Sequence, residues 1–224
     1  MATVLVLGAS RGIGLEFVRQ YVQAGDRVLA TARDAEGLAR LRALGATAFK
    51  LDVADPASIS GLAWQLEGEV IDVALYVAGV YSHSDAHTPP TQPEFDRVMH
   101  TNVLGAMQAI PQVAPLVAAS RAGGKFVFIS SGMGQIGAVE ASDSWTYRVS
   151  KAALNMVVAA AQHDYPDVTL VALSPGWVQT DMGGDQAPLR VADSVAAMRR
   201  TVAGLLPAHR GAFLQYNGQR HATY

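Results

Sequence analysis

The chain has 224 residues, half of them apolar and 16% charged, which suits one folded α/β domain with a full-sized core and excludes a disordered chain. A formal net charge of −2 provides no basic field for nucleic acid or anionic lipid. The chain has no cysteine, which excludes disulfides, thiolate nucleophiles and cysteine metal sites. No basic segment precedes a long apolar run near Met1, and no stretch of about 18 apolar residues occurs. We therefore expect a cytoplasmic protein without a membrane span.

Apolar runs of strand length alternate with longer amphipathic stretches along the whole chain. The predicted strands are Thr3–Leu7, Arg27–Thr31, Ala46–Leu51, Val73–Val77, Lys125–Ser130, Thr169–Ser174 and Ala212–Leu214. The predicted helices are 12–24, 34–43, 56–66, 94–119, 145–163 and 191–204. This alternation predicts a single-domain, Rossmann-type doubly wound parallel sheet of about seven strands with helices on both faces, over residues 1–224. A ligand crevice is then expected at the carboxyl ends of the strands.

A glycine-rich loop joins the first predicted strand to the first predicted helix. Its sequence is Gly8-Ala9-Ser10-Arg11-Gly12-Ile13-Gly14. Backbone N–H groups at a helix N-terminus bind phosphate, and glycines let a pyrophosphate approach without a clashing Cβ. The spacing differs from G-x-G-x-x-G, and an ordinary tight turn is the alternative. The position between a strand and a helix favours dinucleotide binding.

The end of the second predicted strand indicates which nicotinamide cofactor is bound. This strand ends in Ala32 and Arg33, with no acidic residue before Asp34. An acid there would bind the ribose 2′-hydroxyl, whereas a guanidinium can pair with a 2′-phosphate. Arg11 is placed to close on the same phosphate. These residues favour NADP(H), and the alternative is that Arg33 is a solvated residue at the start of a helix.

Candidate catalytic groups follow the fifth predicted strand and open the next long helix. Ser130 and Ser131 end the strand, where a hydroxyl can hold a substrate carbonyl, although serines there are often only turn residues. Tyr147 and Lys151 lie one helical turn apart on a shared face. A lysine ammonium nearby is expected to lower the tyrosine pKa, which suits tyrosine to acid–base work. The alternative is a surface pair without a role.

Taken together, these residues resemble the short-chain dehydrogenase/reductase family over essentially the whole chain. The glycine loop is matched by Gly8, Gly12 and Gly14, and the Tyr-x-x-x-Lys pair by Tyr147 and Lys151. The resemblance implies a catalytic Asn102 in Thr101-Asn102-Val103-Leu104-Gly105 and a catalytic Ser131 followed by Gly134. It implies cofactor contacts from the adenine-binding pair and from the segment after the sixth strand, namely Asp52, Val53, Pro175, Gly176, Val178 and Thr180.

Two further segments place the chain within the family. The segments Tyr147–Asn155 and Pro175–Gly184 resemble the small sniffer-type carbonyl reductases and the C-factor-like proteins, which prefer NADPH. One segment departs from the family. The fourth strand usually ends in Asn-Asn-Ala-Gly, but here it ends in Tyr76-Val77-Ala78-Gly79. Ala78 and Gly79 still permit close approach to the adenosine ribose, while the bracing asparagine amides must be replaced.

The resemblance implies a reduction of a small carbonyl compound. Ser131 would position the carbonyl oxygen, Tyr147 would donate the proton, Lys151 would bind the nicotinamide ribose, and Asn102 would anchor a water. A short lid is expected at Asp181–Arg190 over an open pocket, whose candidate residues are Val80, Tyr81, Trp145, Trp177 and Met182.

The sequence also supports predictions about metal binding and assembly, and it leaves two alternative functions open. His83 and His87 have no acidic neighbours at ligand spacing, so no metal site is expected. If the chain forms a homodimer, helices 94–119 and 145–163 are the expected interface. An NADP(H)-binding sensor or C-factor-like signalling protein with little turnover is the main alternative function. A sugar-nucleotide epimerase or dehydratase is the second, but the chain lacks the extra C-terminal substrate domain that those enzymes need.

Overall fold

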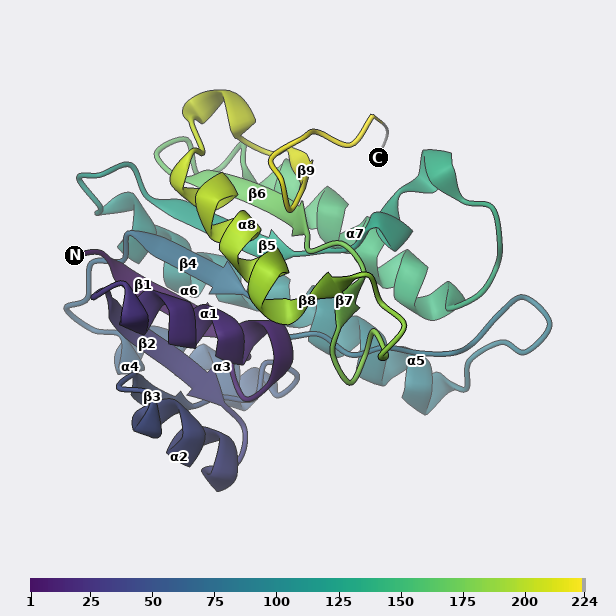
Figure 1. The fold of residues 1–224 in the computed structure, drawn as a ribbon, viewed down its shortest axis with the longest axis horizontal. Helices are drawn as coiled ribbons and strands as arrows, with labels where there is room; N and C mark the ends of the chain where they lie inside the picture. Colours follow the sequence, from purple (N-terminus) through teal and green to yellow (C-terminus); the bar gives the residue numbers. More distant parts are fainter. Residues whose placement is uncertain (223–224) are drawn as a thin grey trace.

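Seven parallel strands form the central sheet of the computed structural model, which describes residues 1–222 (Figure 1). Their order across the sheet is β3-β2-β1-β4-β5-β6-β9. The strands are β1 Thr3–Leu7, β2 Arg27–Ala32, β3 Thr47–Lys50, β4 Val73–Tyr76, β5 Lys125–Ile129, β6 Thr169–Ser174 and β9 Phe213–Gln215. The predicted fold class is confirmed. Residues 223 and 224, the end of the predicted domain, lie outside the described residues.

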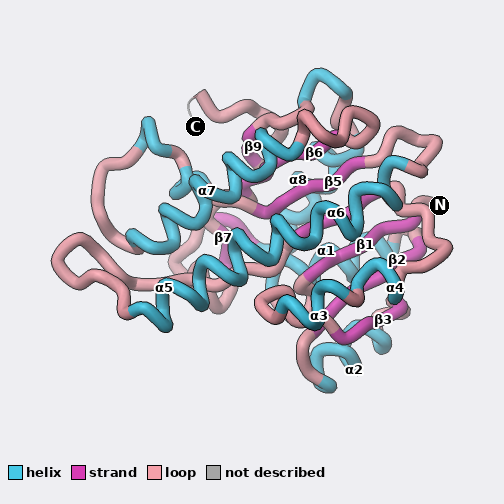
Figure 2. Tube along the Cα trace, turned by 180° about the vertical axis from the view of Figure 1, so that it is seen from behind, coloured by secondary structure: helices cyan, strands magenta, loops and turns pink. Residues whose placement is uncertain are grey.

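Helices cover both faces of this sheet, as the views from the two sides show (Figures 1 and 2). The helices are α1 Gly12–Gln23, α2 Ala35–Ala43, α3 Pro56–Ser60, α4 Leu62–Gln65, α5 Gln92–Met99, α6 Gly105–Ala118, α7 Trp145–Ala161 and α8 Val191–Ala203. Side chains of α1, α2 and α8 pack in the core on one face, and side chains of α3, α4, α6 and α7 pack in the core on the other.

The burial of β1 explains why both faces need helices. Its side chains alternate in direction, so that Val4 and Val6 enter one core while Leu5 and Leu7 enter the other. All four are fully buried. Strand β1 also pairs with β2 on one side and β4 on the other, so the strand order reverses between β1 and β4. This reversal places a crevice at the carboxyl ends of these two strands.

Two predicted helices are interrupted in the structure. The segment predicted as helix 56–66 forms the two short helices α3 and α4. The segment predicted as helix 94–119 forms α5, then a π-helical turn, η1 (His100–Leu104), and then α6. The segment after β6 adds two short strands that the sequence did not predict, β7 (Val178–Gln179) and β8 (Leu189–Arg190), which pair with each other in parallel.

The predicted cytoplasmic location and the predicted homodimer stay predictions. Among residues 1–222, no helix has the length and apolar character needed to cross a membrane. The helices predicted to form a dimer carry exposed apolar side chains, with Met107 on α6 and Met156 on α7 exposed by 52% and 68%.

Candidate active site

The glycine loop lies directly against the end of β4, at the strand reversal. Gly8 has a φ of +86°, and a Cβ there would lie 2.6 Å from the Ala78 backbone. A Cβ on Gly14 would lie 2.4 Å from the Gly8 carbonyl oxygen. No side chain caps α1, and its first turn has no acidic residue. The first N–H groups of α1 therefore remain available for an anion, and the loop fits a pyrophosphate.

A cleft runs from this loop across the strand ends to Tyr147 and Lys151. Most of the predicted cofactor residues line it, namely Gly8, Ser10, Arg11, Gly12, Ile13, Gly14, Arg33, Asp52, Val53, Ala78, Gly79, Tyr147, Lys151, Pro175 and Thr180. Gly176 and Val178 do not line it, although the Val178 carbonyl accepts a hydrogen bond from the Thr180 hydroxyl at 3.4 Å. The sequence did not single out Thr101 or Asp181, which also line the cleft.

The two arginines predicted to meet a 2′-phosphate differ in their contacts. Arg33 is exposed at the end of β2 and lines the cleft. Arg11 lines it too, but its guanidinium donates to the Asp181 carboxylate at 2.9 Å, across the cleft from the glycine loop. Both side chains of this pair are more than two-thirds exposed, so the pair is weak and a phosphate can compete for Arg11.

Ser131 and Tyr147 come together beside the cleft, which Tyr147 lines and Ser131 does not. Tyr147 lies on the first turn of α7, is 7% exposed, and its hydroxyl is hydrogen-bonded by the Ser131 side chain. Ser130 does line the cleft, but its hydroxyl donates to the buried Asn155 side chain at 2.6 Å. Of the two serines that the sequence left in competition, only Ser131 contacts the tyrosine hydroxyl.

Burial shifts the pKa values of both Tyr147 and Lys151, and the shift of Tyr147 is opposite to the expectation. Burial raises the pKa of Tyr147 to about 12, with the hydrogen bond from Ser131 acting in the opposite direction. Burial lowers the pKa of Lys151 to about 8. The Lys151 ammonium lies 5.5 Å from the centre of the tyrosine ring and donates to the Ile129 carbonyl at 2.8 Å. The pKa of Tyr147 is therefore raised by burial, not lowered by Lys151 as the sequence predicted.

Asn102 lies within η1 and is fully buried behind the cleft. Its Oδ1 accepts from the Val80 N–H at 2.8 Å, and its Nδ2 donates to the Val80 carbonyl and the Ser150 hydroxyl, both at 2.9 Å. Ser150 in turn donates to the Tyr147 carbonyl at 2.7 Å. Asn102 thus joins the segment that follows β4 to α7. Ser150 was missed by the sequence, although it stands between the tyrosine and the lysine.

The unusual end of β4 has its own replacement for the absent amides. Tyr76 is fully buried, and its hydroxyl donates to the Thr101 carbonyl in η1 at 2.7 Å. The bracing contact of this strand end is thus made by a phenol and directed to a backbone oxygen.

Of the predicted pocket residues, two line the cleft and three do not. Val80 and Met182 line the cleft, and the Tyr81 ring lies 4.8 Å from the Tyr147 ring. Trp145 is 43% exposed at the start of α7. Trp177 is 57% exposed and donates to the Gly183 carbonyl at 2.8 Å.

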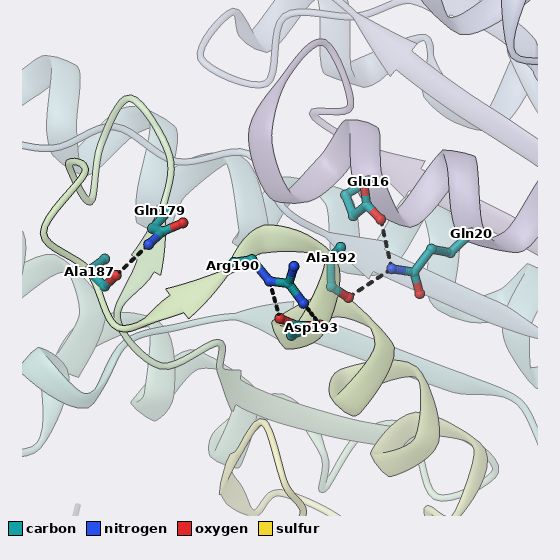
Figure 3. A network of polar contacts seen from close by, with 7 residues as sticks. All are labelled: Glu16, Gln20, Gln179, Ala187, Arg190, Ala192 and Asp193. Atoms are coloured by element: carbon teal, nitrogen blue, oxygen red, sulfur yellow. Dashed lines mark hydrogen bonds and ion pairs between the residues drawn. The ribbon is translucent and has the colours of Figure 1, made fainter.

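The expected short lid is held at both ends. The strands β7 and β8 pair across its base, and the Gln179 side chain donates to the Ala187 carbonyl at 2.9 Å (Figure 3). Arg190, the last residue of the lid, pairs with Asp193 at the start of α8, and Gln20 of α1 donates to the Ala192 carbonyl (Figure 3). Within residues 1–222, no group of three acidic or histidine side chains could hold a metal ion.

Comparison with known proteins places this geometry among characterised relatives. Residues 2–189 match the short chain dehydrogenase family. The chain is 37% identical to "C-signal" of Myxococcus xanthus over 152 residues, which cover 66% of this chain and 90% of that protein. A crystal structure of NADPH-bound carbonyl reductase from chicken fatty liver has a TM-score of 0.88 and 30% identity, with 99% of each chain covered. The carbonyl reductase Sniffer of Drosophila melanogaster has a TM-score of 0.92 and 26% identity, with 99% of each chain covered.

Proposed function

The chain belongs to the short-chain dehydrogenase family, and we propose that it is an NADP(H)-dependent oxidoreductase that reduces a small carbonyl compound. The observation that carries this proposal is the cleft that joins a glycine-lined helix N-terminus to the buried Tyr147 and Lys151 side chains, with Ser131 beside the Tyr147 hydroxyl. NADPH-bound carbonyl reductases among its structural neighbours support the choice of cofactor.

The chain's own residues then have the following roles in reduction. The N–H groups of α1 bind the pyrophosphate, and Arg33 and Arg11 bind the 2′-phosphate. NADPH, when bound, supplies a hydride to the carbonyl carbon. Ser131 orients the carbonyl oxygen toward Tyr147, and the Tyr147 hydroxyl donates its proton to that oxygen, which completes the alcohol.

Lys151 and Asn102 are proposed to support Tyr147 as the proton donor. With a pKa of about 12, Tyr147 is protonated at neutral pH and is therefore ready to act as an acid. Lys151, whose pKa is about 8, still carries a charge at pH 7 and lies beside the tyrosine, where it can bind a ribose hydroxyl. Asn102 is proposed to anchor a water that returns a proton to the site.

Turnover with a panel of carbonyl compounds tests the proposal. Consumption of NADPH, followed at its absorbance band, is expected with at least one class among small aldehydes, ketones and quinones. The apolar Val80 and Met182 side chains in the cleft favour apolar members of each class. Tight NADPH binding without turnover of any compound would contradict the proposal and favour the sensor alternative.

Arg33→Gln is expected to weaken NADPH much more than NADH. Loss of a charge-assisted contact with the 2′-phosphate should raise the KM for NADPH roughly 10- to 100-fold. The KM for NADH should stay unchanged, because NADH has no 2′-phosphate. Steady-state kinetics with both cofactors measure the difference. Arg121→Gln is the matched control, since it removes an equal charge from an exposed loop that precedes β5, at the end of the strands opposite to the cleft. Equal losses for both cofactors would refute the assignment of Arg33.

A further inference from the structure

One backbone carbonyl in η1 lacks the donor that a regular α-helix would give it. The Gly105 N–H donates to the His100 carbonyl, five residues back. In an α-helix the same N–H would donate to Thr101, four residues back. The wider turn therefore leaves the Thr101 carbonyl without this partner, in a part of the molecule where Thr101 is only 7% exposed.

Tyr76 supplies the missing donor from the neighbouring strand. Its hydroxyl donates to the Thr101 carbonyl at 2.7 Å. Its ring is fully buried and stacks on Phe128 with the ring centres 5.9 Å apart. Burial raises the pKa of Tyr76, so the hydroxyl keeps its proton and remains a donor. The side chain thus takes the place of a helical N–H group.

The helix is shaped to admit this hydroxyl. A Cβ on Gly105 would lie 2.5 Å from the Tyr76 hydroxyl oxygen and 2.5 Å from the Val53 carbonyl. Any larger residue at position 105 would displace one of them. Gly105 and Tyr76 are therefore sterically matched, and they meet at the π-helical turn that contains Asn102.

The π-helical turn determines where Asn102 points. Its side chain makes three hydrogen bonds, two to Val80 and one to Ser150, each between 2.8 and 2.9 Å. A Cβ on Gly79 would lie 3.5 Å from both the Asn102 Oδ1 and the Lys151 Nζ, so these two groups flank the same backbone position. A return of the turn to α-helix would rotate Asn102 relative to Lys151, because one residue corresponds to about 100° of helix rotation.

We propose that Tyr76 is a positioning residue: its hydroxyl holds the π-helical turn in place and thereby keeps Asn102 beside Lys151. This inference rests on the proposed function, because it assumes that Asn102 serves proton transfer. A buried tyrosine that only satisfied a carbonyl would affect stability alone. A positioning residue affects catalysis through Asn102, and the two cases are separable.

A double-mutant cycle on turnover separates them. Tyr76→Phe keeps the ring and its stacking on Phe128 but removes the donor. It is expected to lower kcat about tenfold, with the KM for NADPH within about twofold of wild type. In an Asn102→Ala background the same change is expected to cause no further loss of kcat. Phe128→Leu is the control, because it weakens the packing of Tyr76 and keeps the hydroxyl, and it is expected to lower the Tm while kcat is retained.

The outcomes distinguish this inference from the proposed function. Full loss from Tyr76→Phe in the Asn102→Ala background would show that the two residues act independently and would overturn the inference. Normal turnover in Asn102→Ala and in Tyr147→Phe would instead refute the proposed function. Lowered turnover in Asn102→Ala with normal turnover in Tyr76→Phe would overturn only the role of Tyr76.

Nuclear magnetic resonance provides a readout that does not depend on activity. In 15N-labelled Tyr76→Phe protein, the Gly105 amide and the Asn102 side-chain amide are expected to shift and to exchange faster with solvent. The buried Asn155 side-chain amide, bonded to Ser130, serves as the internal reference. Unchanged Gly105 and Asn102 signals would overturn the inference. Should the variant not fold, a scalar coupling across the bond from Gly105 to His100 in the wild type tests the turn, and a coupling to Thr101 instead would overturn it.

Discussion

Tyr147→Phe is expected to lower the turnover of carbonyl substrates by roughly 10³-fold while the Kd for NADPH stays within about threefold of wild type. The change removes one oxygen, the only atom of this side chain that can donate a proton, and leaves the ring in place. The cradle for the pyrophosphate at the start of α1 is untouched. Single-turnover kinetics and a fluorescence titration of NADPH measure the two quantities separately.

Tyr81→Phe is the control for this experiment. Its ring lies 4.8 Å from the Tyr147 ring, and its hydroxyl is bonded to Ser144 rather than to Ser131. We expect less than a tenfold change in kcat, on the order of a modest positioning effect. A variant pair in which Tyr81→Phe is inactive and Tyr147→Phe is active would reverse the assignment of the proton donor.

Lys151→Met is expected to abolish turnover and yet to raise the free energy of unfolding at pH 7. The Lys151 side chain is 3% exposed, and burial disfavours its charged form. Its pKa falls from 10.5 to about 8, and each pKa unit corresponds to about 1.4 kcal/mol. Methionine fills a similar volume without a charge. Because the hydrogen bond to Ile129 is lost as well, we expect a net gain of about 1–2 kcal/mol.

This gain depends on pH in a direction fixed by the lowered pKa. Below about pH 8 the lysine is charged in both the folded and the unfolded protein, so the full cost of its burial is present. Between about 8 and 10.5 the unfolded protein binds more protons than the folded one, and the stability of the wild type rises with pH. The advantage of Lys151→Met should therefore shrink by about 2 kcal/mol between pH 7 and pH 10.

Urea unfolding of both proteins across this pH range measures the difference, in which other titrating groups cancel. Lys50→Met, which changes an exposed lysine at the end of β3, should show no such dependence. A constant difference between wild type and Lys151→Met from pH 7 to pH 10 would mean that the lysine is not desolvated in the folded protein.

The sequence predicted the features that depend on local pattern. Unbroken apolar runs located every strand of the central sheet to within two residues at each end, because strands buried on both faces tolerate few polar residues. The glycine loop was placed correctly, since only residues without a Cβ fit against Ala78 and Gly8. The one-turn spacing of Tyr147 and Lys151 placed both in the same cleft.

Features that depend on burial and on partners distant in sequence could not be predicted in this way. Helical periodicity over 94–119 does not reveal the π-helical turn, because the turn depends on Tyr76, which is 25 residues away from Thr101. Charge neighbours along a helix suggested a lowered pKa for Tyr147, but the pKa depends on solvent access in the folded protein, which the sequence does not give. The Arg11–Asp181 ion pair could not be predicted either, because its residues are 170 positions apart in the sequence.

The parallel pairing of β7 with β8 closes the base of the lid, and this pairing does not depend on which residues form the loop between the two strands. The Gln179–Ala187 contact and the Trp177 contact with Gly183 are made within the loop or at its base, and the central sheet does not include these strands. Doubling the length of a surface loop costs only about 0.6 kcal/mol of closure entropy. Insertions between Asp181 and Leu189 should therefore cost little stability. They would change the residues that cover the cleft and leave the glycine loop unchanged.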